Sequence, residues 1–341
     1  MLRARTKRMR SDEGVQIVLG EIAGLESFWA RKTRRAPADN ASHWMEDKLL
    51  LDMLGLGIEQ AHRFLGGAPD FAAFRQWILA SAGPPDPERL DRYHSWLAAA
   101  PAPAAVSARL RAIDEAPPAL DGDDLRHWDD EGYVILRSAI SAEKATAAAD
   151  LLWRHLGAAP DDPESWYRAD LQGIMVQLFQ HEALEPARRS PRVHKAFAQL
   201  WGSADLWATT DRLSFNPPER SGHPYAGGPL HWDVSLVTPI PFATQGILYL
   251  TDTDADQGAL ILVPGFHRRI HAWLAELPPG ADPRRQDLRA EARPIAAAAG
   301  DLIIWRQDLP HGPSPNRSRR PRLAQYVNMY SPTRDREPAW R

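Results

Sequence analysis

The feature that most constrains the fold is a series of short apolar segments in the C-terminal part of the chain. These segments are rich in β-branched and aromatic residues, and Gly, Pro and Asp residues separate them. They cover residues 206–215, 229–236, 246–252, 259–265, 301–307 and 322–330. Short strands with turns between them favour an antiparallel sandwich or jelly roll.

The N-terminal part of the chain shows a different pattern. Between residues 13 and 113, apolar side chains recur at helical spacing in several stripes, separated by Gly- and Pro-containing breaks. Asp70 stands directly before one stripe, where its carboxylate would cap the first turn of a helix. We therefore expect this region to be helical.

A change of composition at 117–124 suggests a boundary. After it we expect a strand at 133–136, followed by a helix that Ser141 caps. At 341 residues the chain is longer than an average domain. We therefore predict an N-terminal helical region over 1–120 and a second domain over 121–335.

Composition narrows the classes of function. The net charge of −3 gives no general attraction to nucleic acid or to a membrane surface. No apolar run approaches the roughly 20 residues of a membrane span, and no apolar stretch of a leader follows the basic segment 1–10. We expect a cytoplasmic protein in which this segment is a disordered or surface arm, with a targeting or anion-binding segment as the alternative. The chain has no cysteine, so any bound metal must use His, Asp or Glu ligands.

The tripeptide His231-Trp232-Asp233 is a candidate metal-binding motif. On a strand, His231 and Asp233 would point to one face and Trp232 to the other, so Trp232 is expected to pack rather than react. If His311 joined them, two imidazoles and one carboxylate would form the facial triad that holds non-haem Fe(II). A His and an Asp exposed at the rim of a sheet remain the alternative for the tripeptide. His267, beside two arginines, is interpreted as a turn residue or a neighbour of the site.

The residues around His311 resemble a known family. A Gly300-Asp301 turn precedes a buried strand and His311, a small-residue loop with Asn316 follows, and Arg322 stands eleven residues after the histidine. With His231 and Asp233, this order resembles the phytanoyl-CoA dioxygenase (PhyH) family of Fe(II)/2-oxoglutarate oxygenases, whose relatives include ectoine hydroxylase. The stretches DDEGYVILRSAIS and ALILVPGFH are also similar to the family, so the resemblance covers roughly residues 123–332.

The resemblance implies an α+β fold whose core is a double-stranded β-helix, a jelly-roll, cupin-like barrel with flanking helices. It also implies Fe(II) as the metal, 2-oxoglutarate as the cosubstrate and O₂ as the oxidant, with release of succinate and CO₂ and hydroxylation of a small-molecule substrate. Its ligands to the metal would be His231, Asp233 and His311. Its contacts to 2-oxoglutarate would be Arg322, Ser314, Ser214 and Thr210. Because related halogenases replace the carboxylate ligand with a small residue, Asp233 favours hydroxylation over chlorination.

Several alternatives stay open. The same three ligands would serve a zinc hydrolase with a metal-bound water, or a barrel that binds a ligand without turnover. Arg212 shares a strand face with Ser214 and either binds an anionic substrate group or points outward as a solvated charge. Loop 217–230 has a composition that fits either a mobile lid over the site or an ordinary flexible loop. The helical region either shapes the pocket, binds a carrier protein or forms a homodimer interface.

Overall fold

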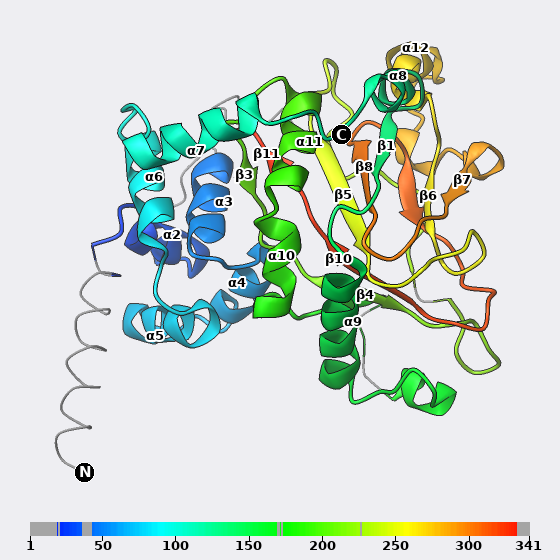
Figure 1. Cartoon of the computed structure of the whole chain (residues 1–341), viewed down its shortest axis with the longest axis horizontal. Helices are drawn as coiled ribbons and strands as arrows, with labels where there is room; N and C mark the ends of the chain where they lie inside the picture. The colour runs from blue at the N-terminus through cyan, green and yellow to red at the C-terminus, as the bar shows by residue number, and fades with distance from the viewer. Residues whose placement is uncertain are drawn as a thin grey trace. The chain divides into compact units, whose positions relative to one another are not determined.

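The computed structural model describes residues 19, 21–35, 43–168, 171, 173–225 and 227–332, and Figure 1 traces the chain. The basic segment 1–10 lies outside these residues. The described chain divides into two compact units. The first ends at Ala112 and includes Pro332, and the second runs from Ile113 to Ser331. The domain limits expected from the sequence, at 120 and 121, stay a prediction.

The first unit is helical, as the apolar stripes predict. Its helices are α2 (Leu25–Lys32), α3 (Trp44–Met53), α4 (Ile58–Leu65), α5 (Phe71–Ala82), α6 (Pro87–Leu97) and the start of α7 (Ala104–Glu115). Asp70 caps α5, because its side chain accepts a hydrogen bond from Ala73 N. The buried side chains of Phe28 and Phe74 contact each other in the core. No helix in the described ranges is both long and apolar enough to cross a bilayer.

The second unit combines helices with antiparallel strands. Its α-helices after α7 are α8 (Gly122–Glu131), α9 (Ala142–Leu156), α10 (Glu185–Arg188), α11 (Pro191–Trp201) and α12 (Ile270–Glu276). Its short 3-10 helices are η1 (Pro163–Tyr167), η2 (Glu182–Leu184), η3 (Phe266–Arg268), η4 (Pro283–Arg285) and η5 (Arg289–Glu291). Its strands are β1 (Tyr133–Leu136), β2 (Met175–Val176), β3 (Trp207–Ala208), β4 (Leu213–Asn216), β5 (Thr244–Tyr249), β6 (Leu260–Leu262), β7 (Arg293–Ile295), β8 (Leu302–Arg306), β9 (His311–Pro313), β10 (Arg322–Tyr326) and β11 (Met329–Tyr330).

Two sheets enclose the core of this unit. The larger has the order β1-β8-β5-β10-β4-β2 and the smaller the order β7-β6-β9, with antiparallel neighbours throughout. Apolar side chains of both sheets, such as Tyr249 on β5 and Leu262 on β6, form one buried cluster between them. Helices α9 and α11 cover the outer face of the larger sheet through a second cluster (Figure 1). This is the expected α+β fold with a double-stranded β-helix core.

The limits of several strands differ from the expectation. The segment 206–215 is split, because β3 leaves the large sheet and pairs with β11 in a two-stranded sheet. The prediction of a strand at 229–236 is wrong in this structure. Only His231 forms a bridge, with His311, and the residues after it bend. Thus His311 begins β9, and His231 extends the edge of the small sheet beyond it.

Candidate metal centre

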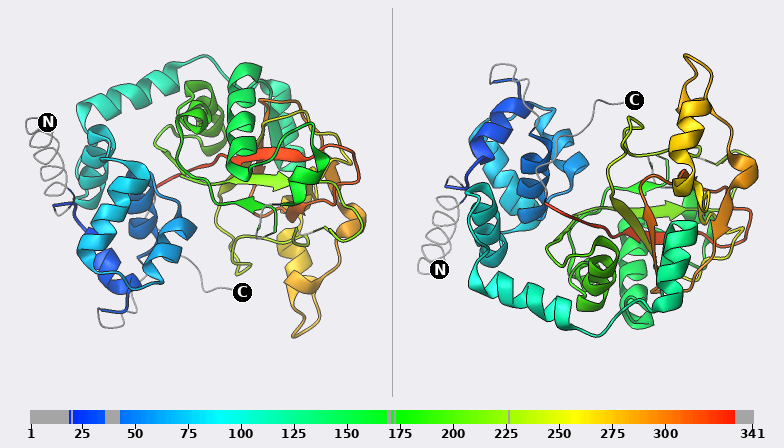
Figure 2. Two further views of the ribbon diagram at one scale, coloured as in Figure 1. Left: turned by 90° about the horizontal axis from the view of Figure 1, so that it is seen from below. Right: turned by 90° about the horizontal axis from the view of Figure 1, so that it is seen from above.

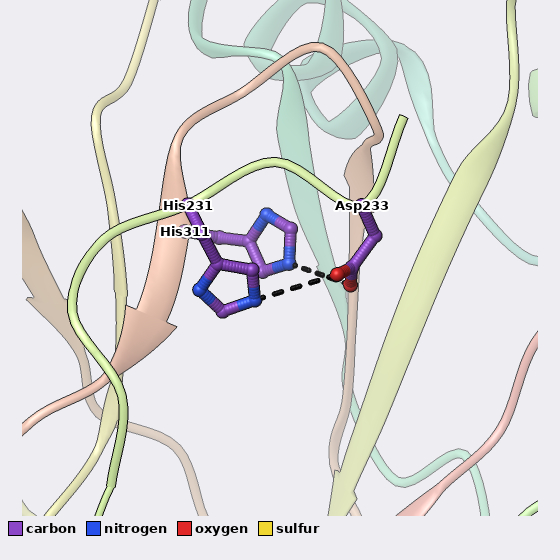
Figure 3. Close-up of side chains that lie close together, drawn as sticks. All are labelled: His231, Asp233 and His311. Atoms are coloured by element: carbon purple, nitrogen blue, oxygen red, sulfur yellow. Dashed lines mark hydrogen bonds and ion pairs between the residues drawn. The ribbon is translucent and has the colours of Figure 1, made fainter. Parts of the chain in front are cut away.

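The edge of the small sheet brings three expected ligands together. His231 and His311 exchange both backbone hydrogen bonds, with N···O distances of 2.9 and 3.0 Å. Their rings therefore lie side by side, with centroids 4.6 Å apart. Asp233 follows two residues after His231, and its carboxylate turns toward both rings (Figure 3). Trp232 faces away, as predicted, because it is buried and its Nε1 donates to Asp308 O.

The hydrogen bonds of the two imidazoles leave the same nitrogen available on each. Nδ1 of His231 lies 2.8 Å from Pro229 O, and Nδ1 of His311 lies 3.1 Å from Leu309 O. A carbonyl can only accept, so each Nδ1 carries a proton, and in the neutral form of each ring Nε2 presents a lone pair. The Nε2 atoms of His231 and His311 lie 3.5 and 3.3 Å from the Asp233 carboxylate. The ligand atoms of all three residues lie within 4.8 Å of one another, which fits a metal ion.

Electrostatics keep these ligands in their metal-binding forms. Burial, and then the neighbouring His311, lower the pKa of His231, so its ring is neutral near pH 7. Burial alone would raise the pKa of Asp233, but the two histidines and Gln245 hold it well below its ordinary value. The Asp233 side chain is nevertheless 55% exposed. A charged carboxylate that solvent can reach leaves room for further ligands.

Gln245 fixes the carboxylate from the side of the large sheet. Its Nε2 donates to Asp233 Oδ2 at 2.7 Å, while its Oε1 accepts from Trp305 Nε1 at 3.0 Å. The indole can only donate, so it sets which end of the Gln245 amide faces Asp233. Sequence reasoning missed Gln245. The alternation of strand 246–252 extended backwards would have placed it on the inner face, but nothing in the sequence shows that it reaches Asp233.

Arg322 lies at the start of β10, on the face that looks toward the small sheet. It shares that face with Ala324, which belongs to the cluster between the sheets. Its Nη2 donates to Ser214 Oγ at 2.7 Å, so the expected neighbour Ser214 orients it. Arg322 is only 1% exposed, and its Nε has no hydrogen-bond partner among the described residues. A buried guanidinium with an unsatisfied donor fits an anionic ligand.

The other residues expected near 2-oxoglutarate have different surroundings. The Ser314 hydroxyl donates to Ala259 O at 2.9 Å, which connects two segments of the small sheet. Thr210 is buried just before β4. Arg212 is neither fully solvated nor fully enclosed, with a side chain 23% exposed and its Nε 3.8 Å from Asp211 Oδ1. Burial lowers the pKa of Arg212, whereas Tyr326 and the charge of Asp233 oppose this shift.

The other residues of the family pattern, Asn316 and Asp301, form hydrogen bonds with backbone groups. Asn316 is fully buried, and its side chain donates to the carbonyls of Asn216 and Arg320, which closes the loop after β9. Asp301 accepts from Ser138 N and Arg137, so it joins the turn after β1 to β8. His267 lies 3.1 Å from Asp129 O through its Nε2 and belongs to η3, outside the candidate triad.

A comparison with protein families decides the assignment. The model of the phytanoyl-CoA dioxygenase (PhyH) family matches residues 128–324, more than half of the chain. The chain belongs to this family. PhyH proteins are 2-oxoglutarate-dependent non-haem iron oxygenases, and His231, Asp233 and His311 are the candidate facial triad of this member.

Known proteins similar to this PhyH chain are distant in sequence. A Dictyostelium discoideum protein that carries the family's name is 24% identical over 182 residues, 42% of this chain and 52% of its own length. The match thus spans about half of that relative. An ectoine dioxygenase of Bordetella bronchiseptica is 24% identical over 230 residues, 60% of this chain and 73% of its own length. The solved structure of the α-ketoglutarate-dependent carbocyclase SnoK, from nogalamycin biosynthesis, is 17% identical, with 63% of this chain and 87% of SnoK covered and a TM-score of 0.43.

Proposed function

We propose that this PhyH protein is an Fe(II)/2-oxoglutarate-dependent dioxygenase that hydroxylates an unactivated C–H bond of a small molecule. Succinate and CO₂ would be the products of the cosubstrate. The observation that carries the proposal is the pairing of two sites in one barrel. One is the convergent set of Nε2, Nε2 and carboxylate oxygen, and the other is the buried Arg322, whose Nε is unsatisfied among the described residues.

The donor set fits Fe(II). Two imidazoles and one carboxylate on one face would hold Fe(II) and leave room at the metal for a cosubstrate and O₂. When bound, Fe(II) with 2-oxoglutarate and O₂ supplies the oxidising chemistry of the family. The protein's own part is to keep His231 and His311 in the Nδ1–H tautomer and to keep Asp233 ionised. Because Asp233 occupies the carboxylate position, we propose hydroxylation rather than chlorination.

Arg322 would hold the far carboxylate of 2-oxoglutarate. A planar guanidinium offers two parallel donors to a carboxylate, and burial strengthens that pairing because water is excluded. Ser214 would orient the guanidinium through its 2.7 Å hydrogen bond. Ser314 and Thr210 remain proposed contacts of the cosubstrate. In the described structure the Ser314 hydroxyl donates to Ala259 O, so it can offer an incoming carboxylate its proton only by exchanging that partner.

Arg322 and the two histidines also weigh against the alternative functions, a zinc hydrolase and a noncatalytic binding barrel. A zinc hydrolase has no need for a buried cation whose donor is unsatisfied in the described structure. A noncatalytic barrel has no need for two imidazoles held with their Nε2 atoms toward one carboxylate. The relative named as an ectoine dioxygenase supports a small organic substrate for this chain as well. A homodimer formed through the helical unit stays a prediction, which the mass in solution would test.

Anaerobic titration of the full chain tests the proposal. Addition of Fe(II) followed by 2-oxoglutarate should produce a weak visible charge-transfer band, because the cosubstrate chelates the metal. Zn(II) should give no such band, and His311→Ala should abolish it by removing a ligand. If the folded, iron-loaded protein shows no band with 2-oxoglutarate, the proposed function is wrong. Substrate-stimulated release of succinate across a panel of small molecules would then identify what is hydroxylated.

A further inference from the structure

The segment that carries Asp233 receives little support from the sheets. Within the described part of the chain, the only β-bridge that this segment forms with a strand is the one between His231 and His311. Residues 232–237 then bend away from regular strand geometry. Yet Asp233 must stay in place for a metal, because ligands that are displaced by a fraction of an ångström lose affinity. Something other than a strand neighbour must therefore fix these peptide groups.

Arg284 contacts the backbone on both sides of Asp233. Its Nη1 donates to Trp232 O at 2.7 Å, and its Nη2 donates to Val234 O at 2.6 Å. These two carbonyls flank the Asp233 residue directly. A single planar guanidinium thus replaces the hydrogen bonds that a neighbouring strand would supply. Two donors in a rigid fork restrain the direction of both peptides, whereas one flexible donor would restrain only one.

Arg284 is itself held in place. It belongs to η4, in the loop between α12 and β7 that projects from the unit in Figure 2. Asp282 caps this short helix by accepting from Arg284 N at 2.9 Å, and Pro283 beside it is buried. Burial lowers the pKa of Arg284, whereas the charges of Asp282 and Asp233 counteract this. The Arg284 residue itself is partly buried.

We propose that Arg284 is a positioning residue for the candidate metal centre, which fixes the Asp233 carboxylate through the carbonyls of Trp232 and Val234. It acts from the backbone side, whereas Gln245 acts on the carboxylate itself. The inference rests on the proposed function, because it assigns Asp233 to a metal. It extends the support of the site to a loop about 50 residues later in the chain, which the family motif does not include.

Arg284→Met tests the role, because methionine keeps much of the aliphatic stem and removes every donor. Arg285→Met is the matched control, since Arg285 is adjacent, 86% exposed and paired with Asp282 at 3.4 Å. Fe(II) alone is added anaerobically to each full-length protein in competition with a coloured chelator. Co(II) is added in a parallel series, because its visible spectrum reports ligand geometry. We expect Arg284→Met to bind Fe(II) about 10- to 100-fold more weakly and to change the Co(II) spectrum.

The other variants make the outcome decisive. Arg285→Met should retain native Fe(II) affinity, and Arg284→Lys should lie between native protein and Arg284→Met, because a lysine keeps one donor group. Native affinity and a native Co(II) spectrum in Arg284→Met would overturn the proposal, even if its melting temperature fell. Should Arg284→Met fail to fold, Arg284→Lys decides: weaker binding supports the role and native binding overturns it. If the native protein takes up no Fe(II), the proposed function fails as well.

Discussion

Arg322 is the residue whose surroundings most require a ligand. It is almost fully buried, Ser214 engages one Nη, and its Nε lacks a partner among the described residues. We expect Arg322→Gln to weaken binding of 2-oxoglutarate by about 2–5 kcal/mol, or roughly 30-fold and more, because a buried carboxylate would lose its cation. Fe(II) affinity should stay nearly native, because Arg322 is not a metal ligand. Anaerobic calorimetry with Fe(II) alone and then with 2-oxoglutarate measures both.

Arg320→Gln is the control for this substitution. Arg320 precedes Arg322 by two residues, but it is 61% exposed and pairs with Asp254 at the surface. The Arg320→Gln variant should therefore bind 2-oxoglutarate with the same affinity as the native protein. Equal loss in both variants would mean that the loop, and not the buried cation, is responsible. Native 2-oxoglutarate affinity in Arg322→Gln would remove Arg322 from the cosubstrate site.

The two kinds of site residue differ in how far sequence could predict them. His231, Asp233 and His311 have a spacing that chemistry and a family pattern both recognise, so their convergence was expected. Gln245 and Arg284 support Asp233 through contacts made 12 and about 50 residues away in the chain. A glutamine on a strand and an arginine in a loop are ordinary residues until the fold brings them to Asp233. The roles of Gln245 and Arg284 can therefore be recognised only from the three-dimensional structure.

Among the elements, β5 of the large sheet is linked to the small sheet by the hydroxyl group of Tyr249. The Tyr249 side chain is fully buried, its Oη donates to Ile295 O of β7 at 3.0 Å, and it accepts from Leu260 N of β6 at 2.9 Å. Tyr249→Phe removes both of these buried hydrogen bonds, so we expect a loss of about 1–3 kcal/mol in the free energy of unfolding. Urea unfolding measures it. Tyr133→Phe on β1 should change the stability by no more than about 0.5 kcal/mol.

The same hydroxyl predicts a response to alkaline pH. Burial is the main cause that raises the pKa of Tyr249 to about 12. An unfolded tyrosine has a pKa of about 10, so the folded state favours the neutral phenol. The stability that Tyr249 contributes is therefore complete below about pH 10 and is lost as the pH rises through about 12. Between about pH 10 and 12, the free energy of unfolding should fall less steeply with pH for Tyr249→Phe than for the native protein. Equal slopes would contradict this assignment.

The strand predictions show where local pattern stops being informative. The strands β1, β5, β8 and β10 were expected near their true positions, because their apolar runs are buried in the large sheet. Segment 229–236 alternates equally well, yet it forms only the bridge at His231. Its backbone partner is the guanidinium of Arg284, and alternation cannot distinguish a side-chain partner from a strand. Residues 206–215 and 322–330 each divide between two sheets for a similarly non-local reason.

At the scale of the whole molecule, all residues proposed for metal and cosubstrate lie in the second unit. The first unit has its own core, in which the buried Phe74 contacts the rings of Phe28, Phe64 and Trp77. Helical units of this kind are stabilised by their own apolar contacts. We therefore expect damage to that core to leave the metal centre intact.

Phe74→Ala tests this independence. Removing a fully buried phenylalanine creates a cavity and should cost about 3–5 kcal/mol of stability in the first unit. Calorimetry should show a melting transition at lower temperature for part of the chain, while Fe(II) and 2-oxoglutarate affinities at 10 °C remain within about twofold of native, because no proposed ligand contacts Phe74. If metal affinity falls together with the transition, the helical unit supports the site directly. Unchanged affinity would instead restrict the unit to roles that leave the metal centre untouched, such as association with a second copy.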